Sequence, residues 1–440
     1  MLSLEHFHRL SKEGFWLILG QITAVVGSLI GVRVLTSLLD PAAYGELALG
    51  ITAVMLVNQV IMGPLSNGIT RFYAPAAKQK DLGRYLKAAL RLVISSTGAV
   101  ALIIVITIFG FLVIGKAKWA AIATASLVYA VFSSYNSILS GIQNAARQRI
   151  IVALRQGMEP WALFIIAAGL IFWLGPSSAV AMTGYVLAAV LIFITQSVFF
   201  RRIIDQARVE HQEKWGSISI WQKQILEYSW PFATWGIFLW AYMSSGKWSL
   251  QFFISIKEVG YYAVLLQLGY QPFMTLASMV TRLISPIYFH RIGDFSDPRH
   301  IVNALESVWR ITVISIIGTL LMTVATFLFH KQIFFSLVAP AYAGVSVFLP
   351  IVVFSAGLLA SSMFCSLGMQ IQKTTRLLIL PKIISYAIGT LLTFAGAARF
   401  GLTGVIYAAA FTTIIHLLWV AILLRKQFCM ACAKVNVKTG

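Results

Sequence analysis

The chain has 440 residues, of which 59% are hydrophobic and 11% are charged, and its mean hydropathy is +0.84. In soluble domains about half of the residues are apolar and about a quarter are charged, so this composition excludes an ordinary soluble protein and indicates a polytopic membrane protein. The formal net charge of +20 would suit a nucleic-acid partner. However, the basic residues are distributed as a membrane topology requires, and no nucleic-acid partner is expected.

The sequence predicts an all-α integral membrane protein of about twelve transmembrane helices, because each span needs about 20 mostly apolar residues. The first six spans are expected near residues 14–39, 44–70, 92–115, 119–141, 157–174 and 179–200. The other six are expected near residues 228–254, 260–289, 309–330, 342–369, 378–398 and 402–424. The longest hydrophilic connection, residues 201–227, separates the two sets. We therefore expect an N-terminal six-helix lobe with a cytoplasmic linker, residues 1–225, and a C-terminal six-helix lobe with a short basic cytoplasmic tail, residues 226–440.

Most of the 34 Lys and Arg residues lie in alternate connections between the predicted spans. Since connections rich in Lys and Arg stay on the cytoplasmic side, this pattern predicts that both termini are cytoplasmic. The basic surplus also indicates contact with anionic membrane lipids.

Residues 20–74 are predicted to form a helical hairpin whose outline returns later in the chain. Two apolar runs flank one short polar turn at residues 39–46. A shift of 215 residues aligns Gly31 with Gly246 and Gly45 with Gly260. Six helices return the chain to its starting side, so such repeats are parallel and related by a pseudo-two-fold axis along the membrane normal. Transporters use this arrangement with the substrate site between the halves.

Small residues recur every three or four positions along the first predicted helix, at Gly20, Ala24, Gly27 and Gly31. Such a stripe lets another helix approach closely. Arg33 is rotated by about 200° from Gly31, so it points away from the packing face, toward either a cavity or the lipid interface.

Prolines are expected to kink several of the spans. Kinked helices suit a protein that changes conformation during transport, although proline is also common in membrane helices. The four prolines within or near the ends of spans are Pro64, Pro272, Pro286 and Pro350.

Four basic residues, Arg33, Lys247, Arg282 and Arg71, are the candidate substrate-binding residues. Arg33 and Lys247 lie about 9 Å and about 10 Å from the outer ends of their helices at 1.5 Å per residue, and Arg282 and Arg71 lie toward the cytoplasmic end. All 14 acidic residues fall in connections or at the ends of spans. Because a buried cation without a carboxylate partner is costly, and a pyrophosphate would satisfy several at once, an anionic, amphiphilic cargo is favoured. Alternatively, Arg33 and Lys247 snorkel to the outer interface, and Arg71 and Arg282 are topology anchors.

Enzyme chemistry receives little support from the sequence. The seven histidines show no metal-ligand spacing, and no paired carboxylates, G-x-S-x-G motif or phosphate-binding loop is present. Cys429 and Cys432 form a C-x-x-C in a basic tail without a second Cys or His pair, which favours unpaired thiols. We therefore predict no catalytic residues, no metal and no cofactor.

Short motifs, taken in their order and spacing, resemble a known family. They are GVRVL at residues 31–35, DPAAYG at 40–45, RF at 71–72, EVGYY at 258–262 and FGLTGV at 400–405. The chain resembles the multidrug/oligosaccharidyl-lipid/polysaccharide exporter superfamily, specifically its polysaccharide flippase, Wzx-like branch. It departs from that pattern at residues 244–248, SSGKW, where family members often carry an Asp followed by a basic residue.

The resemblance implies a MATE-like, V-shaped pair of six-helix bundles that rock between inward-open and outward-open states. Its implied cargo is a polyprenyl-pyrophosphate-linked oligosaccharide, a repeat unit of O-antigen, lipopolysaccharide or exopolysaccharide, moved across the bacterial inner membrane. A polysaccharide polymerase or other glycan assembly proteins are implied partners. Three alternatives stay open: a lipid II flippase of peptidoglycan synthesis, a cation-coupled multidrug exporter, and a membrane-embedded glycan polymerase or transferase.

Overall fold

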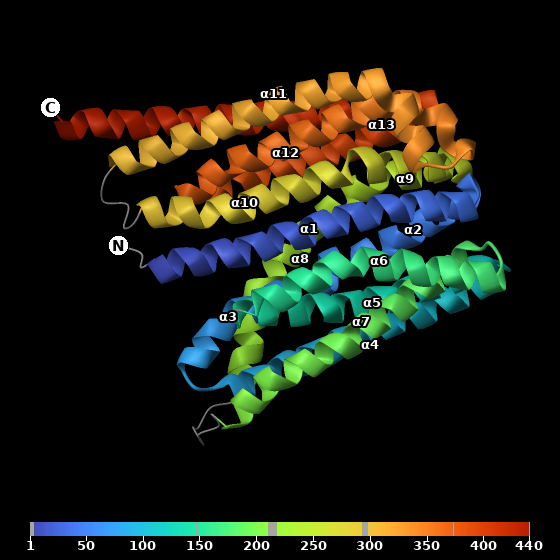
Figure 1. Cartoon of the computed structure of the whole chain (residues 1–440), viewed down its shortest axis with the longest axis horizontal. Helices are drawn as coiled ribbons and strands as arrows, with labels where there is room; N and C mark the ends of the chain where they lie inside the picture. Colours follow the sequence, from blue (N-terminus) through green and yellow to red (C-terminus); the bar gives the residue numbers. More distant parts are fainter. Residues whose placement is uncertain (1–3, 147, 210–217, 293–297, 373, 440) are drawn as a thin grey trace. The chain divides into compact units, whose positions relative to one another are not determined.

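The computed structural model describes residues 4–146, 148–209, 218–292, 298–372 and 374–439, and every regular element among them is a helix (Figure 1). The predicted all-helical class is therefore confirmed. Internal contacts divide the chain into two compact units, Met1–Trp240 and Ala241–Gly440, and each unit is described by itself. The division falls inside one long helix, whereas the sequence places the lobe boundary at residues 225 and 226.

The first unit consists of long helices joined by short connections. Between α2 and α3 the backbone makes one widened π turn, η1. The elements are α1 (Leu4–Leu38), α2 (Pro41–Val57), η1 (Asn58–Met62), α3 (Gly63–Lys78), α4 (Leu82–Val113), α5 (Ala117–Ala145), α6 (Arg149–Leu174), α7 (Ser178–Val209) and the N-terminal part of α8 (Ile218–Phe253).

The second unit begins within α8 and is built in the same way. Short 3-10 turns, η2 and η3, precede two of its helices. Its further elements are α9 (Ile256–Gly269), α10 (Gln271–Ile292), α11 (Pro298–Leu337), η2 (Pro340–Phe348), α12 (Leu349–Ile371), η3 (Thr375–Leu378) and α13 (Ile379–Thr439).

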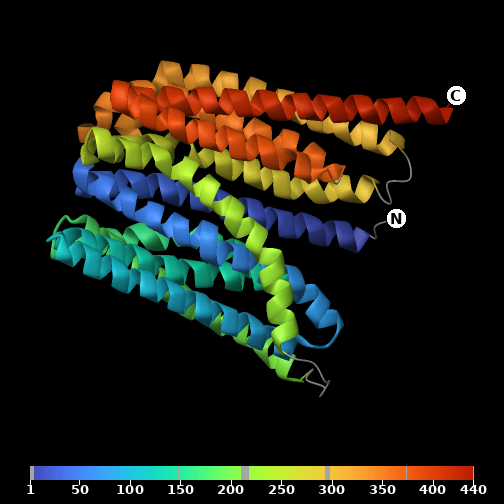
Figure 2. The ribbon, with the colours of Figure 1, turned by 180° about the vertical axis from the view of Figure 1, so that it is seen from behind.

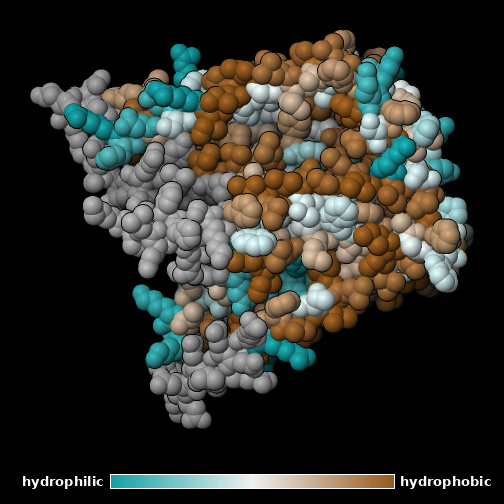
Figure 3. All heavy atoms as spheres, in the orientation of Figure 1, coloured by the Kyte–Doolittle hydropathy of each residue, from teal (hydrophilic) through white to brown (hydrophobic). Residues whose placement is uncertain are grey.

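The chain is a multi-pass membrane protein. Within the described residues, ten helical segments are long and apolar enough to cross a membrane. The face shown in Figure 3 carries apolar side chains over the middle of the helices, with hydrophilic side chains toward their ends. Two of the twelve predicted spans, 378–398 and 402–424, fall within one of these segments, Arg376–Ala433, and the predicted span 228–254 lies in α8, which is not among the ten.

The glycine stripe of α1 packs against α6, as the sequence predicts. A Cβ atom on Gly20 would lie 2.5 Å from the carbonyl oxygen of Ala153, and one on Gly27 would lie 2.5 Å from the Trp161 ring. The Trp161 indole also donates a 3.0 Å hydrogen bond to the Thr23 carbonyl. The small residues therefore let the two backbones approach closely, and this contact fixes which face of α1 is buried.

The two halves of the predicted repeat start their second helix in the same way. Asp40 caps α2 by accepting a 2.7 Å hydrogen bond from the amide of Ala43. Ser255, which the 215-residue shift aligns with Asp40, caps α9 by accepting a 3.4 Å hydrogen bond from the amide of Glu258. Each cap satisfies an amide that the helix leaves without a partner, which explains why a capping residue follows each short polar turn.

Helix breaks coincide with three of the four prolines expected to kink the spans. Pro64 directly follows the π turn η1, Pro272 follows the break between α9 and α10 at Tyr270, and Pro350 lies at the start of α12. Proline lacks the amide that would continue the helical ladder, so the helix ends or widens there. Pro286 lies within α10, and its side chain is outside the described residues.

Helix α13 bends sharply at Gly401, the first of the two glycines in the FGLTGV motif. Its φ of 59° lies in the left-handed region, where a residue without a Cβ is favoured. On either side of the bend, Gly396 and Gly404 pack backbone to backbone, and a Cβ on Gly396 would lie 2.7 Å from the Gly404 carbonyl oxygen. The single assigned helix is thus a tight pair of spans.

Helix α8 packs along α3 and α2 in the first unit (Figure 2). The Trp221 indole donates to Asp81 at 2.8 Å, and the Trp240 indole donates to the Thr52 carbonyl at 2.8 Å. Gly68 lets the α8 backbone approach, because a Cβ there would lie 2.8 Å from the Ile225 carbonyl oxygen. These contacts hold the N-terminal part of α8 in the first unit, and Lys247 lies on its C-terminal part in the second.

Candidate functional site

The four predicted substrate-binding cations lie on four different helices. Arg33 is exposed near the end of α1, and Arg71 is exposed on α3. Arg33 precedes the α1–α2 turn and Arg71 follows it by some thirty residues, so the two lie toward opposite ends of the first unit and are not brought together there. Lys247 is half-buried on α8 within the second unit. Arg282 belongs to α10, and its side chain lies outside the described residues.

Arg33 ends a row of exposed apolar side chains on α1. Ile22, Val26 and Ile30 are 55%, 43% and 38% exposed, and Arg33 follows one turn later. The spacing of three or four residues places them on one helix face. Because the opposite face packs on α6 through the glycine stripe, this row is turned away from the packing contacts of its own unit. Arg33 therefore points away from the face of α1 that packs on α6, as the sequence predicts.

Helix α8 has two faces with different roles in the second unit. The Tyr242 ring stacks on Tyr386 of α13 at 4.9 Å and 11°, and Gly246 fits against the Tyr262 ring of α9. Lys247 lies on the other face with two polar side chains at helical spacing, Ser244 and Gln251. Lys247 is therefore turned away from the aromatic contacts that hold α8 in this unit.

The polar face of α8, defined by Ser244, Lys247 and Gln251, carries unused hydrogen-bonding capacity. The Ser244 hydroxyl and the Gln251 carbonyl oxygen are buried, and neither has a hydrogen-bond partner in the described part of the chain. No carboxylate among the described residues pairs with Lys247. A cation flanked by a hydroxyl and an amide suits a phosphate or sugar hydroxyls, because these ligands supply the missing acceptors and donors.

An aromatic stack forms the core behind this face, and the sequence analysis did not identify it. Tyr386 contacts Tyr242 on one side and the ring of His416 on the other, at 5.7 Å and 27°. Gly389 makes room for the stack, since a Cβ there would lie 2.6 Å from the Tyr242 ring. His416 is 2% exposed, and Lys382 lies close enough to interact with it electrostatically. The stack thus joins α8 to α13 within the second unit.

A charged pair within α6 corrects the expectation that all acidic residues lie at helix ends or in connections. Arg155 and Glu159 form an ion pair at 3.6 Å, and Glu159 lies about 15 Å from the start of the helix at 1.5 Å per residue. Glu159 also interacts electrostatically with Tyr129, whose ring contacts Tyr185 at 5.7 Å. Because the two charges partly neutralise each other, both can lie within the helix. Helix α6 therefore starts at Arg149, eight residues before the predicted span.

A second carboxylate is buried at the start of α2. Glu46 is 7% exposed and accepts hydrogen bonds from the Lys118 ammonium of α5 and the Ser178 hydroxyl of α7, both at 2.5 Å. Ser178 is fully buried, whereas the side chain of Lys118 is 60% exposed. With its oxygens engaged by two protein donors, Glu46 ties together the ends of three helices.

The described residues contain no group of three or more His, Cys, Asp or Glu side chains that could hold a metal ion. Each unit by itself carries one feature that can contact a ligand: in the first unit an exposed apolar row on α1 leads to Arg33, and in the second unit Lys247 lies beside polar groups of α8. Guanidinium and ammonium groups are the side chains that pair with phosphate anions in proteins.

Comparison with known proteins gives a family and a fold. Residues 10–290 match the family model described as "Polysaccharide biosynthesis protein". No curated protein matches the chain.

Three solved structures illustrate the fold. The lipid II flippase MurJ in an inward closed conformation superposes with a TM-score of 0.70 at 13% identity, covering 97% of this chain and 90% of that one. An inward-facing MATE family multidrug resistance transporter of the MOP superfamily gives 0.67 at 14% identity, covering 94% and 96%. The MATE transporter VcmN of Vibrio cholerae in its bent form gives 0.57 at 15% identity, covering 96% and 98%. The chain therefore has a MATE- and MurJ-like fold.

Proposed function

Because the chain belongs to the polysaccharide biosynthesis protein family, we propose that it is a flippase for polyprenyl-pyrophosphate-linked oligosaccharide. The cargo moves from the cytoplasmic to the periplasmic leaflet of the bacterial inner membrane by alternating access of two lobes around a cationic central cavity. The observation that carries this proposal is the exposed row on α1, where apolar side chains lead to Arg33.

The row on α1 fits each part of the proposed cargo. Ile22, Val26 and Ile30 offer apolar surface to the polyprenyl chain, and Arg33 offers two parallel donors to the pyrophosphate, an anion that guanidinium groups bind well. The polar face of α8 supplies Lys247 for the same anion and uncommitted groups for sugar hydroxyls. In the same scheme Arg71 and Arg282 hold the anion toward the cytoplasmic end.

The orientation follows from the basic residues. Their concentration in alternate connections supports cytoplasmic termini and a cytoplasmic linker between the lobes. Cargo then enters from the leaflet on which lipid-linked glycans are built, and a polymerase or other glycan assembly proteins receive it on the other side.

The experiment is complementation of glycan export. Arg33→Ala and Lys247→Ala, singly and together, are expressed at matched abundance in cells that lack the gene, and surface glycan is measured. Each single variant is expected to reduce export, and the double variant to reduce it by more than either. Export at the wild-type level in the double variant would remove both residues from the site.

A lipid II flippase is the second candidate function, and the fold shared with MurJ favours it. Lipid II also carries a pyrophosphate between a polyprenyl chain and sugars, so the cations described above would serve it equally. Depletion of the protein distinguishes the two functions: cells that lose a surface polysaccharide but grow normally support the first, and cells that lyse support the second.

A further inference from the structure

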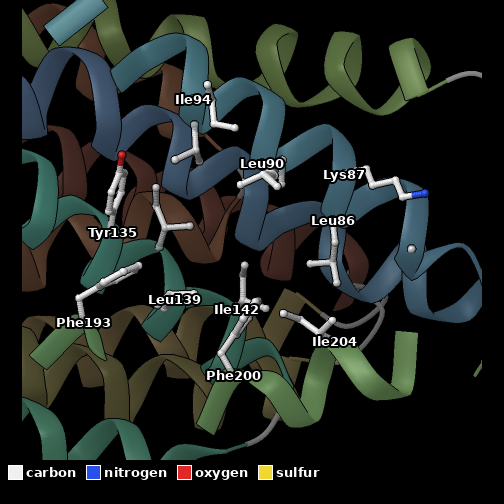
Figure 4. A pocket seen from close by; sticks show the side chains of 14 residues that line it. Leu86, Lys87, Leu90, Ile94, Tyr135, Leu139, Ile142, Phe193, Phe200 and Ile204 are labelled. Carbon is white, nitrogen blue, oxygen red and sulfur yellow. The ribbon is translucent and has the colours of Figure 1, made fainter. Parts of the chain in front are cut away.

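An apolar groove lies between α4, α5 and α7 in the first unit, away from the residues assigned to the cargo. Its volume is about 670 Å³ (Figure 4). The floor is made by Ile138 and Ile142 of α5, which are buried, and the walls include Leu90 of α4 and Phe200 of α7. Apart from Lys87 and Tyr135, every side chain that lines the groove is apolar or absent.

The groove exists because α4 rests on α5 and makes little contact with α7. Small residues on α4, Gly83 and Ala89, leave room where the helix faces the floor. Leu90 and Ile94 on the same helix are 58% and 59% exposed. The groove therefore opens sideways along α4, toward the surface that a membrane protein presents to lipid.

The groove lies where α4 and α7 enter the membrane. Its lining runs from Gly83 to Ile94 on α4 and from Phe193 to Ile204 on α7. Eleven residues of helix correspond to about 16 Å, and the hydrocarbon core of a bilayer is about 30 Å thick. One end is closed by the rings of Tyr135 and Phe193, whose centroids are 5.6 Å apart. The predicted spans start at residue 92 on α4 and end at residue 200 on α7, so the groove crosses the membrane boundary, and a lipid with its head group at the outer end of the groove places its acyl chain along the inner end.

The one charged side chain that lines the groove lies at its other end. Lys87 lies there beside Leu86 and Ile204, and its ammonium group is directed away from the apolar middle (Figure 4). No carboxylate among the described residues pairs with Lys87, and the nearby Asp81 already binds Arg84 and Trp221.

At the closed end, the only polar side-chain group that lines the groove is the Tyr135 hydroxyl. It already shares a 2.7 Å hydrogen bond with the Thr97 hydroxyl. The groove thus has one cationic end and one apolar end. It complements an amphiphile with a single anionic head group.

We propose that this groove binds one anionic phospholipid of the cytoplasmic leaflet, with its phosphate at Lys87 and an acyl chain along Leu90, Ile142 and Phe200. The lipid fills the space between α4 and α7 and so completes the packing of the first unit. The site is separate from Arg33 and Lys247, and it does not depend on which cargo the protein carries.

The test measures lipid retention on the full-length protein by native mass spectrometry. The protein is delipidated in detergent and titrated with phosphatidylglycerol or phosphatidylcholine bearing the same acyl chains. Lys87→Gln removes the charge, and Lys116→Gln, an exposed lysine after α4, is its control. Leu90→Trp obstructs the groove, and Leu102→Trp on the same helix, 61% exposed and outside the groove, is its control.

The wild type is expected to retain one phosphatidylglycerol more tightly than phosphatidylcholine. Lys87→Gln should reduce the preference for phosphatidylglycerol about fivefold, the usual contribution of one lysine near an anionic surface. Leu90→Trp should weaken both lipids, and both control variants should match the wild type. Both sites tested are exposed, so these variants are expected to fold.

Three outcomes would overturn the proposal. The first is equal retention of phosphatidylglycerol and phosphatidylcholine by the wild type. The second is a Lys87→Gln variant that behaves as Lys116→Gln does. The third concerns competition between phosphatidylglycerol and polyprenyl phosphate at equal concentration. If polyprenyl phosphate displaces phosphatidylglycerol from the wild type but not from Leu90→Trp, the groove binds a prenyl chain instead.

Discussion

Removal of the Glu46 carboxylate should destabilise the first unit without abolishing transport. In Glu46→Ala the fully buried Ser178 loses its acceptor, and a charge-assisted hydrogen bond of 2.5 Å from Lys118 is lost. A buried group left without a partner costs about 1 to 3 kcal/mol, and a hydrogen bond to a charged group contributes about 1.5 to 3 kcal/mol. We expect a loss of about 3 kcal/mol in the free energy of unfolding for Glu46→Ala.

The two partners provide matched comparisons for this prediction. Lys118→Ala should cost less than about 1 kcal/mol, because that side chain is 60% exposed and returns to solvent. Ser178→Ala should cost about 1 kcal/mol. The assay is thermal unfolding of the purified variants in one detergent, combined with glycan export at matched protein abundance.

The expected order of lost stability is Glu46→Ala, then Ser178→Ala, then Lys118→Ala, with export per folded molecule near the wild-type level in all three. Equal losses for Glu46→Ala and Lys118→Ala would refute the assignment of the stabilisation to the buried hydroxyl. Loss of export with unchanged stability would show that Glu46 binds a transported or coupling cation instead.

Three further predictions concern packing, capping and the charged pair of α6. Gly184→Val should lower the thermal unfolding temperature strongly, because its Cβ would lie 2.4 Å from the α6 backbone. Gly98→Val should change the temperature little, because a Cβ there has no neighbour within 4 Å. Similar temperatures for both variants would contradict the packing. Asp40→Ala should cost about 1 kcal/mol through loss of the α2 cap, and restoration by Asn but not by Leu in the same unfolding assay would support that cause. Arg155→Met should destabilise the protein more than Arg155→Met combined with Glu159→Met, because the single change leaves the half-buried Glu159 carboxylate unpaired. Additive effects in this double-mutant cycle would show that the ion pair is not coupled.

Much of the fold could be predicted from the sequence because its signals are local. The stripe of Gly20, Gly27 and Gly31 predicts a close helix contact, and the contact with α6 follows from it. The polar turn at residues 39–46 predicts a break between two helices, and α2 begins within it, capped by Asp40. Small residues, caps and prolines act on their own helix, so their effect is visible without knowing which helix lies opposite.

Long-range partners could not be predicted in the same way. Arg155 and Glu159 each lower the hydropathy of their segment, so hydropathy predicts the start of α6 eight residues too late. Their i, i+4 spacing nevertheless allows the two charges to pair. Nothing along the chain indicates that Glu46 meets Lys118 and Ser178, which are 72 and 132 residues away. The stack of Tyr242, Tyr386 and His416 is likewise formed only by the packing of α8 with α13.

The most direct measurement of the central claim is transport by the purified protein in liposomes. An oligosaccharide linked to polyprenyl pyrophosphate is placed in one leaflet, and its appearance in the other is followed with a glycosidase that acts only from outside. We predict rapid translocation by the wild type and a loss of at least about tenfold in Arg33→Gln combined with Lys247→Gln. The exposed control Lys331→Gln should show no loss. Wild-type rates in the double variant, or equal transport of the same glycan on an uncharged polyprenol, would contradict the central claim.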